Sequence, residues 1–247
     1  MIIVLRYKVN ILFKKIMIIK VCGMREPDNI RAVEQIGIDW MGFVFWPESP
    51  RFVQMIHSRA GIIPDYSSFP GEQFENVKRA PELPKRVGVF VDDMPQNIVT
   101  RVYNFKLDFV QLHGSENRVM IENLRRTLVP DIAPDVKIIK AISVNQANDI
   151  AKCRDYEGAI DYFLFDTKCP TVGASGKHFD WSVLEAYDGD TPFLLSGGIG
   201  PDDVERILAF RHPKFVGIDI NSRFEMAPAV KDVDSIRDFV QALRAIE

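Results

Sequence analysis

The chain has 247 residues, of which 47% are hydrophobic and 26% are charged. Its 31 basic and 34 acidic residues leave a formal net charge of −3, which argues against a nucleic-acid partner and against an anionic membrane surface. The composition excludes the collagen-like, disordered and disulfide-rich classes, and one domain of this length can bury a core without a disulfide or a metal.

Cysteine use and hydropathy predict a reducing compartment. The cysteines are Cys22, Cys153 and Cys169, without a C-x-x-C pair or zinc-finger spacing, so we expect neither a disulfide framework nor a metal site. No segment reaches the roughly 18 apolar residues of a membrane-spanning helix. The first 15 residues contain four basic side chains and lack a secretory cleavage pattern. We therefore expect a cytoplasmic protein with reduced thiols.

Short apolar runs recur along the chain and predict eight β-strands. The runs are Met17–Cys22, Trp40–Phe45, Arg86–Val91, Phe109–His113, Lys137–Ile142, Tyr162–Asp166, Phe193–Ser196 and Phe215–Ile220. Their continuous apolar character is typical of parallel strands that are covered on both faces.

The segments between these runs predict helices, because proline or cap-forming residues stand at their starts. The predicted helices are Asp28–Gln35, Gln96–Tyr103, Glu116–Leu128 after Ser115, Gln146–Lys152 after Asn145, Trp181–Tyr187 after Asp180, and Asp202–Phe210. Strands that alternate with helices form right-handed βαβ units. Eight such units favour an α/β fold, a single-domain (β/α)8 TIM barrel with parallel strands, over an open doubly wound sheet.

Two segments do not fit this alternation. Residues 1–16 precede the first predicted strand and a second methionine, Met17, so we interpret them as a dispensable N-terminal extension. Residues 63–84 contain four prolines and a glycine among polar residues, too long for an ordinary connection and too broken for a helix. We expect a loop excursion there, inside one catalytic barrel domain that covers residues 17–247.

Residues at the carboxyl ends of the predicted strands carry the chemistry, since barrel enzymes place their active sites there. Cys22, His113 and Asp166 bring a thiol, an imidazole and a carboxylate, which are the groups of general acid–base catalysis. Asp166 ends an apolar run, whereas Cys22 alone also fits a small buried hydrophobic residue. His113 also fits a histidine that the strand-end backbone satisfies. Arg51, in the second loop, either binds a carboxylate or is solvated.

A phosphate site is predicted after the last two strands. Gly197 and Gly198 follow the seventh strand and lead into a helix, so their amides can approach an anion. After the eighth strand, Ser222 and Glu225 have the S-x-x-E spacing of a capping box, which predicts a short extra helix. These two loops form the recurrent phosphate site of such barrels.

Several segments, in their order along the chain, resemble phosphoribosylanthranilate isomerase. They are Lys20–Met24 (KVCGM), Gly42–Phe45 (GFVF), Ser49–Val53 (SPRFV), Val87–Val91 (VGVFV), Val110–Gly114 (VQLHG), Phe165–Lys168 (FDTK), Gly176–Trp181 (GKHFDW), Leu195–Ile199 (LSGGI) and Gly217–Ser222 (GIDINS), with Glu225, Pro228, Lys231 and Asp232. The resemblance extends over residues 17–247.

This resemblance implies an aldose–ketose isomerase of tryptophan biosynthesis that uses no cofactor and no metal. Its reaction is the Amadori rearrangement of N-(5-phosphoribosyl)anthranilate to 1-(2-carboxyphenylamino)-1-deoxyribulose 5-phosphate. The resemblance makes Asp166 the general acid that opens the furanose ring, Cys22 the general base that removes the C2′ proton, and Arg51 the residue that holds the anthranilate carboxylate. The implied residues for binding the phosphosugar are His113, Gly197, Gly198, Asn221 and Ser222. We expect a monomer or a homodimer.

The chain departs from the family pattern in two loops. Ala174 interrupts the glycine-rich loop after the sixth strand, and Asn221 and Arg223 stand where serine and glycine are usual. Arg223 therefore either adds a phosphate contact or shifts the turn.

Two other functions remain open at this point. One is another phosphosugar-barrel enzyme, such as a histidine-pathway isomerase, which typically uses paired aspartates at strands one and five; this chain has Cys22 and Ser143 there. The other is a catalytically silent phosphosugar-binding protein, against which the presence of Cys22 and Asp166 argues.

Overall fold

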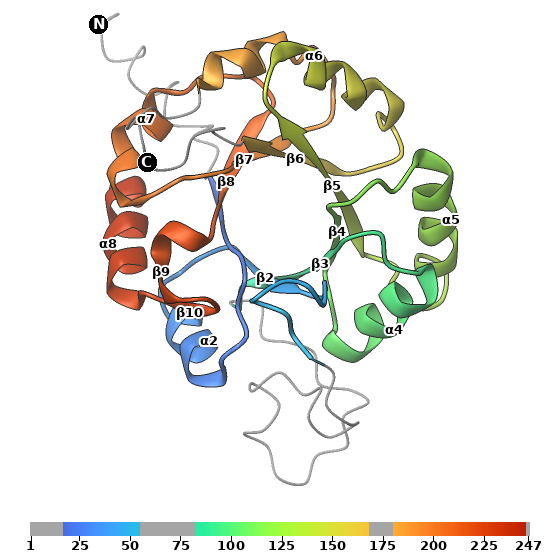
Figure 1. Cartoon of the computed structure of the whole chain (residues 1–247), viewed down its shortest axis with the longest axis horizontal. Helices are drawn as coiled ribbons and strands as arrows, with labels where there is room; N and C mark the ends of the chain where they lie inside the picture. Colours follow the sequence, from blue (N-terminus) through green and yellow to red (C-terminus); the bar gives the residue numbers. More distant parts are fainter. Residues whose placement is uncertain (1–16, 55–82, 168–179, 246–247) are drawn as a thin grey trace, which may run out of the picture.

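The computed structural model describes residues 17–54, 83–167 and 180–245, and these form a closed barrel of eight parallel strands within a ring of helices (Figure 1). The strands are β1 (Ile18–Val21), β2 (Trp40–Val44), β3 (Lys85–Phe90), β4 (Phe109–Leu112), β5 (Lys137–Val144), β6 (Tyr162–Thr167), β7 (Phe193–Ser196) and β8 (Phe215–Ile220). Pairing of β1 with β8 closes the barrel. The predicted TIM barrel is confirmed.

Helices and short 3₁₀ turns connect the strands on the outside of the barrel (Figure 1). They are α2 (Pro27–Glu34), α4 (Pro95–Phe105), α5 (Arg118–Leu128), α6 (Ala147–Ile150), η2 (Ala151–Asp155), η3 (Trp181–Ala186), η4 (Pro201–Asp203), α7 (Val204–Ala209), η5 (Ser222–Phe224) and α8 (Val233–Arg244). A small antiparallel hairpin of β9 (Glu225–Ala227) and β10 (Val230–Lys231), absent from the sequence prediction, follows η5.

Several predicted helix starts are confirmed by the local chemistry. Pro27 and Pro95 occupy the first turn of α2 and α4, where the missing proline N–H costs no intrahelical hydrogen bond. Asp180 accepts a hydrogen bond from Ser182 N (3.0 Å) and caps η3, which is a 3₁₀ helix rather than an α-helix.

The predicted starts of α5 and α6 are wrong by one or two residues. Ser115 does not cap α5, because its Oγ donates to Asp92 Oδ1 (2.7 Å) in the preceding loop. Asn117 takes its place and accepts a backbone N–H of the first turn. At α6 the capping residue is Gln146 and not Asn145.

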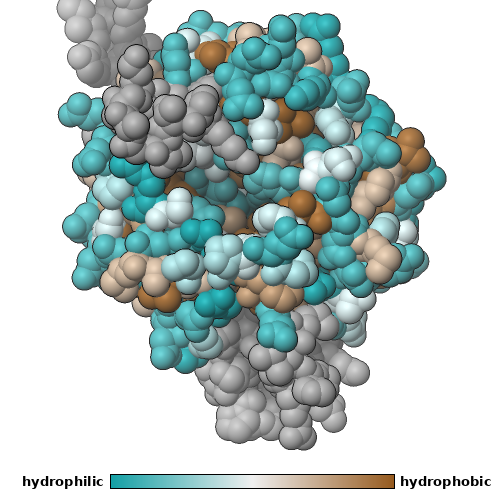
Figure 2. Space-filling view, viewed as in Figure 1, coloured by the Kyte–Doolittle hydropathy of each residue, from teal (hydrophilic) through white to brown (hydrophobic). Residues whose placement is uncertain are grey.

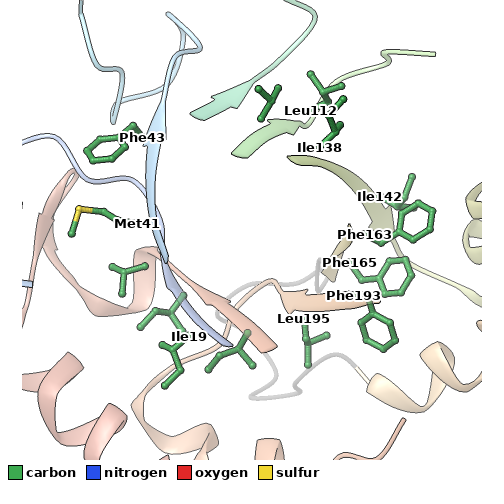
Figure 3. Close-up of a cluster of buried hydrophobic side chains, with 14 of the residues drawn as sticks. Ile19, Met41, Phe43, Leu112, Ile138, Ile142, Phe163, Phe165, Phe193 and Leu195 are labelled. Carbon is green, nitrogen blue, oxygen red and sulfur yellow. The ribbon is translucent and has the colours of Figure 1, made fainter. Parts of the chain in front are cut away.

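The main hydrophobic core lies between the barrel and the surrounding helices. In Figure 3 the labelled side chains of the strands point away from the barrel centre; they are Ile19, Met41, Phe43, Leu112, Ile138, Ile142, Phe163, Phe165, Phe193 and Leu195. Successive strand residues point to opposite faces, so the residues between them point inward. Burying one such phenylalanine contributes about 1.5–3 kcal/mol to stability.

The barrel interior divides into an apolar part and a polar part. The apolar part contains Trp40, Val87, Phe109, Ile139, Ala141, Leu164, Leu194 and Val216. Other inward positions carry polar side chains, namely Lys20, Gln111, Asp166, Ser196 and Asp219. The apolar side chains fill one end of the barrel. The polar side chains line a cavity at the other end, where the strands have their carboxyl ends.

The outer surface in Figure 2 is mostly hydrophilic, and hydrophobic residues occur there in small separate groups. Among the described residues, no helix is long and apolar enough to cross a membrane. The predicted extension, residues 1–16, lies outside the described residues, as does the predicted excursion up to residue 82.

Candidate active site

A cavity of about 400 Å³ opens at the carboxyl ends of the strands. Its walls bring together most of the predicted site residues: Cys22, His113, Asp166, Gly197, Gly198, Asn221 and Ser222. The remaining lining residues are Val44, Trp46, Val89, Val91, Gln111, Ser196, Ile199 and Asp219. Thiol, imidazole, carboxylate and glycine amides therefore face one space, whereas Arg51 lies beside it.

Cys22 is held at the end of β1 by backbone pairing and by close packing. Its N–H donates to Ile220 O (2.9 Å), which continues the β1–β8 ladder by one residue. The thiol packs on Gly42 of β2, where an added Cβ would lie 2.8 Å from Cys22 Sγ. Only a residue without a side chain fits at this position of β2, and the thiol keeps its place at the cavity wall.

Lys20 and Cys22 are two residues apart on the same strand, so their side chains lie on the same face. Lys20 therefore points into the barrel beside Cys22. Its Nζ lies 2.9 Å from Asp219 Oδ1, and its side chain is 0% exposed. Burial alone lowers the pKa of Lys20, but the charges of Asp219 and of a Cys22 thiolate raise it above its ordinary value. Burial raises the pKa of the Cys22 thiol, and the Lys20 ammonium opposes that rise.

Asp166 faces His113 across the cavity mouth. His113 Nε2 lies 3.5 Å from Asp166 Oδ2, and His113 Nδ1 lies 3.3 Å from the Gln111 amide nitrogen. Both ring nitrogens of His113 therefore contact polar side chains of the cavity wall. The imidazole of His113 thus lies at the cavity, next to the carboxyl group of Asp166.

A buried ion pair supports the loop that carries His113. Lys140 Nζ lies 3.0 Å from Glu116 Oε2 and donates to Gly114 O (2.7 Å). Glu116 also accepts from the N–H groups of Gly114 (2.9 Å) and Asp92 (3.0 Å). These contacts join the loops after β3 and β4 to β5, and they fix the backbone next to the imidazole.

Loop 7 (residues 197–200) begins with two glycines whose backbone is left-handed. Gly197 and Gly198 have φ of 97° and 66°, in the left-handed region that favours glycine. An added Cβ at Gly197 would collide with Thr167 O at 2.0 Å, whereas no atom lies within 4 Å of one at Gly198. Gly197 is therefore needed for packing on β6, and Gly198 borders open space.

Loop 8 (residues 221–224) forms the predicted short helix, but the predicted capping box is wrong. Asn221, not Ser222, is the residue before η5, and Glu225 makes no capping hydrogen bond to it. Glu225 instead turns toward Arg51 and Lys231. Arg223 lies against loop 7, with Nη1 3.4 Å from Gly198 O.

Arg51 is joined to Glu225 by a two-pronged ion pair. Its Nε lies 2.8 Å from Glu225 Oε1 and its Nη2 lies 2.5 Å from Glu225 Oε2. The guanidinium packs beside Gly23, where an added Cβ would lie 2.5 Å from Arg51 Cδ. Arg51 is thus not freely solvated, because Glu225 holds its guanidinium. It also lies near the Cys22 end of the cavity, because Gly23 directly follows Cys22 in the chain.

Sequence reasoning singled out the strand-end residues but missed two polar residues that lie two positions before them. Gln111 precedes His113 and Asp219 precedes Asn221 at this spacing. The signal was present, because a polar residue two positions before a functional strand end must point into the same barrel interior. Among the described residues, no cluster of three or more His, Cys, Asp or Glu side chains forms a metal site.

Comparison with known proteins settles the family. The sequence profile described as "N-(5'phosphoribosyl)anthranilate (PRA) isomerase" matches residues 19–242. The chain belongs to this family. N-(5'-phosphoribosyl)anthranilate isomerases of Parabacteroides distasonis and Phocaeicola vulgatus are each 44% identical to it, over 92% of the chain and 93% and 98% of their own lengths. The chain is thus an aldose–ketose isomerase of tryptophan biosynthesis, and the reading as another phosphosugar-barrel enzyme is set aside.

Solved structures of phosphoribosylanthranilate isomerases have the same fold. The Thermotoga maritima enzyme has a TM-score of 0.72 and 30% identity, covering 93% of this chain and 100% of its own. A second structure, in complex with reduced 1-(o-carboxyphenylamino)-1-deoxyribulose 5-phosphate, has a TM-score of 0.70 and 28% identity with the same coverage. A dimeric form is known for the Thermotoga maritima isomerase.

Proposed function

We propose that Asp166 and Cys22 divide the phosphoribosylanthranilate isomerase reaction between them as general acid and general base. Asp166 gives its proton to the furanose ring oxygen while the C1′–O4′ bond breaks, and the anthranilate nitrogen lone pair forms the iminium. The Cys22 thiolate then takes the C2′ proton, and the C–H electrons neutralise the iminium as an enolamine. Transfer of the enol proton to C1′ gives the ketone.

The observation that carries this proposal is that both groups line one cavity from different strands. Cys22 follows β1 and Asp166 lies on β6, so a substrate between them meets an acid and a base on separate walls. Lys20 supplies the positive charge that a thiolate needs in a buried place. His113 contacts the Asp166 carboxyl and steadies its orientation.

The two ends of the substrate fit two further parts of the site. Loop 7 and loop 8 offer Gly197, Gly198, Asn221 and Ser222 to the phosphate, since left-handed glycines and a helix start present N–H groups to an anion. Arg51 receives the anthranilate carboxylate in a charge-assisted contact. The relative that holds the reduced product analogue supports a phosphosugar ligand with a carboxyphenyl group.

We further propose that the enzyme works in the cytoplasm as a monomer or a homodimer. A catalytic thiol must stay reduced, and Cys22 and Cys153 are both free. The dimeric Thermotoga maritima isomerase supports the second of these states. Sedimentation at micromolar concentration distinguishes them.

The function is tested by fluorescence-detected loss of phosphoribosylanthranilate under single-turnover conditions. Cys22→Ser is expected to lower the rate by about 10²–10⁴-fold while binding stays intact, because an acid–base group is lost. Asp166→Asn is expected to abolish ring opening, because an amide does not deliver the proton.

Cys153→Ser is the matched control for Cys22→Ser. Cys153 is also a buried free thiol, but it lies in η2, and burial raises its pKa to about 12. Normal turnover of C2′-deuterated substrate by Cys22→Ser would remove Cys22 from the mechanism. Binding without turnover in the wild-type chain would favour the silent phosphosugar-binding protein.

A further inference from the structure

A three-residue network beside Cys22 joins loop 2 to the β9–β10 hairpin. Glu225 lies between two cations: Arg51 on one side, and Lys231 Nζ at 2.6 Å from Glu225 Oε1 on the other. Lys231 also donates to Asn221 Oδ1 (2.7 Å) in loop 8. The side chains of Lys231 and Glu225 are 0% and 5% exposed, whereas that of Arg51 is 19% exposed and reachable from solvent.

The geometry leaves one particular edge of the Arg51 guanidinium available. Glu225 occupies Nε and one N–H of Nη2, in the planar two-pronged arrangement that suits a carboxylate. Among the described residues, no other group accepts a hydrogen bond from this guanidinium. The Nη1 group and the second N–H of Nη2 therefore form a free edge that can hold another carboxylate in the same way.

The charges of the network match a single anion. Arg51 and Lys231 contribute two positive charges and Glu225 one negative charge, which leaves one positive charge for one carboxylate. Burial alone would raise the pKa of Glu225, but hydrogen bonds from the two cations hold it below its ordinary value. Glu225 is thus a buried carboxylate with both oxygens in use.

We propose that Glu225, braced by Lys231, is a positioning residue that aims the free edge of Arg51 at the anthranilate carboxylate and so selects substrates that carry one. This inference rests on the proposed role of Arg51. A long, flexible side chain at the end of an open loop loses rotamer freedom on binding a ligand. Glu225 reduces this entropy cost of binding, because it already holds the guanidinium in one position before the ligand binds.

The test compares two ligands that differ only in the carboxylate. One is reduced 1-(o-carboxyphenylamino)-1-deoxyribulose 5-phosphate, and the other is its phenylamino analogue without the carboxyl group. Isothermal titration calorimetry gives the ratio of the two dissociation constants. We expect the wild-type chain to favour the carboxylate ligand by about ten- to a hundredfold, the range of a charge-assisted contact. Glu225→Gln should cut this preference by about tenfold without changing the dissociation constant of the phenylamino ligand.

A double variant separates positioning from net charge. Glu225→Gln raises the formal charge of the network by one, and Lys231→Met lowers it by one. The double variant therefore has the wild-type charge but lacks the ion pair that holds Arg51 in place. We expect the double variant to have the same low preference for the carboxylate ligand as Glu225→Gln. We expect Glu225→Asp to recover part of the wild-type preference. A return to the wild-type preference in the double variant would overturn positioning, as would an equal loss of affinity for both ligands.

Two further variants keep this proposal distinct from the proposed function. Glu122→Gln breaks an exposed ion pair with Arg118 (2.7 Å) on α5 and should leave the preference unchanged. If Arg51→Ala keeps the wild-type preference, the role of Arg51 itself is wrong. If Arg51→Ala loses the preference and Glu225→Gln keeps it, only the positioning role of Glu225 is wrong.

Discussion

Lys20 Nζ lies 2.9 Å from Asp219 Oδ1 inside the barrel, and both charges act on the Cys22 thiol. A buried ammonium that is already neutralised by a carboxylate is a weaker support for a thiolate than a lone cation would be. Burial raises the pKa of the Cys22 thiol above its ordinary value, and the Lys20 ammonium lowers it too little to reverse that rise. A thiolate at Cys22, the proposed base, therefore forms more readily as the pH rises.

Removal of the Lys20 charge should move the pH dependence of the reaction. The charged groups that act on Cys22 are Lys20, Asp219, Lys231 and Arg51. Because the base acts as thiolate, kcat/KM should rise with pH toward the raised pKa of Cys22. Loss of one nearby cation raises that pKa further, so Lys20→Met should shift the rising limb to higher pH and slow the reaction at pH 7 most.

The experiment compares the double variant Lys20→Met/Asp219→Asn with Asp219→Asn, because these two differ only in the charge of residue 20. Lys20→Met alone leaves a buried carboxylate without its cation and destabilises the fold. The pH profile of kcat/KM and the pH dependence of alkylation of Cys22 by iodoacetamide should shift together. Lys152→Met, which removes an exposed lysine paired with Asp149, is the control and should shift neither. The same profile in the double variant and in Asp219→Asn would remove Lys20 from the activation of Cys22.

Gly42 should matter for catalysis through the position of the thiol. A Cβ at residue 42 would lie 2.8 Å from Cys22 Sγ and 3.0 Å from Cys22 Cα, so Gly42→Ala must displace the base. A misplaced catalytic group costs on the order of 10²-fold in rate, so kcat should fall by about that factor. Gly88→Ala serves as the matched control. Its Cβ would lie 2.4 Å from Leu107 Cδ1, away from the cavity. If both variants lose thermal stability alike but neither loses kcat, the placement of the thiol by Gly42 is unimportant.

The strand ends were predictable because the apolar runs are short and interrupted by polar residues. Phe193–Ser196 and Phe215–Ile220 have the predicted bounds, and Cys22 and Asp166 meet in one cavity as expected. The role of Glu225 was not predictable in this way. Its S-x-x-E spacing fits a capping box, but the decisive partner, Arg51, lies 174 residues earlier in the chain and is brought near only by closure of the barrel.

A shortened chain that begins at Met17 should fold and retain activity. The start of β1 is fixed by residues of the barrel itself: Arg244 donates to Met17 O (2.8 Å) and pairs with Asp39, which in turn accepts from Ile19 N (2.7 Å). Unfolding in urea should give a free energy within about 0.5 kcal/mol of the full chain. Loss of soluble protein or of kcat would show that residues 1–16 contribute to the fold.

Gly198 should be the most sensitive position for recognition of the phosphate. Its φ of 66° is left-handed, and asparagine and aspartate are the residues other than glycine that adopt this conformation most readily. An added Cβ there meets no atom within 4 Å, so both side chains fit the empty cavity. Gly198→Asn and Gly198→Asp therefore place nearly the same shape in loop 7, and they differ by one negative charge.

The aspartate variant should bind phosphate-bearing ligands more weakly than the asparagine variant. Two unit charges about 4 Å apart repel by about 1–4 kcal/mol between bulk water and a protein surface, and about 1.4 kcal/mol corresponds to a factor of ten in affinity. Titration with the reduced product analogue should show a dissociation constant at least about fivefold higher for Gly198→Asp than for Gly198→Asn. The difference should shrink in high salt, because screening weakens repulsion at an open site. Equal affinities at low salt would place the phosphate away from loop 7, and the assignment of Gly197 and Gly198 would be wrong.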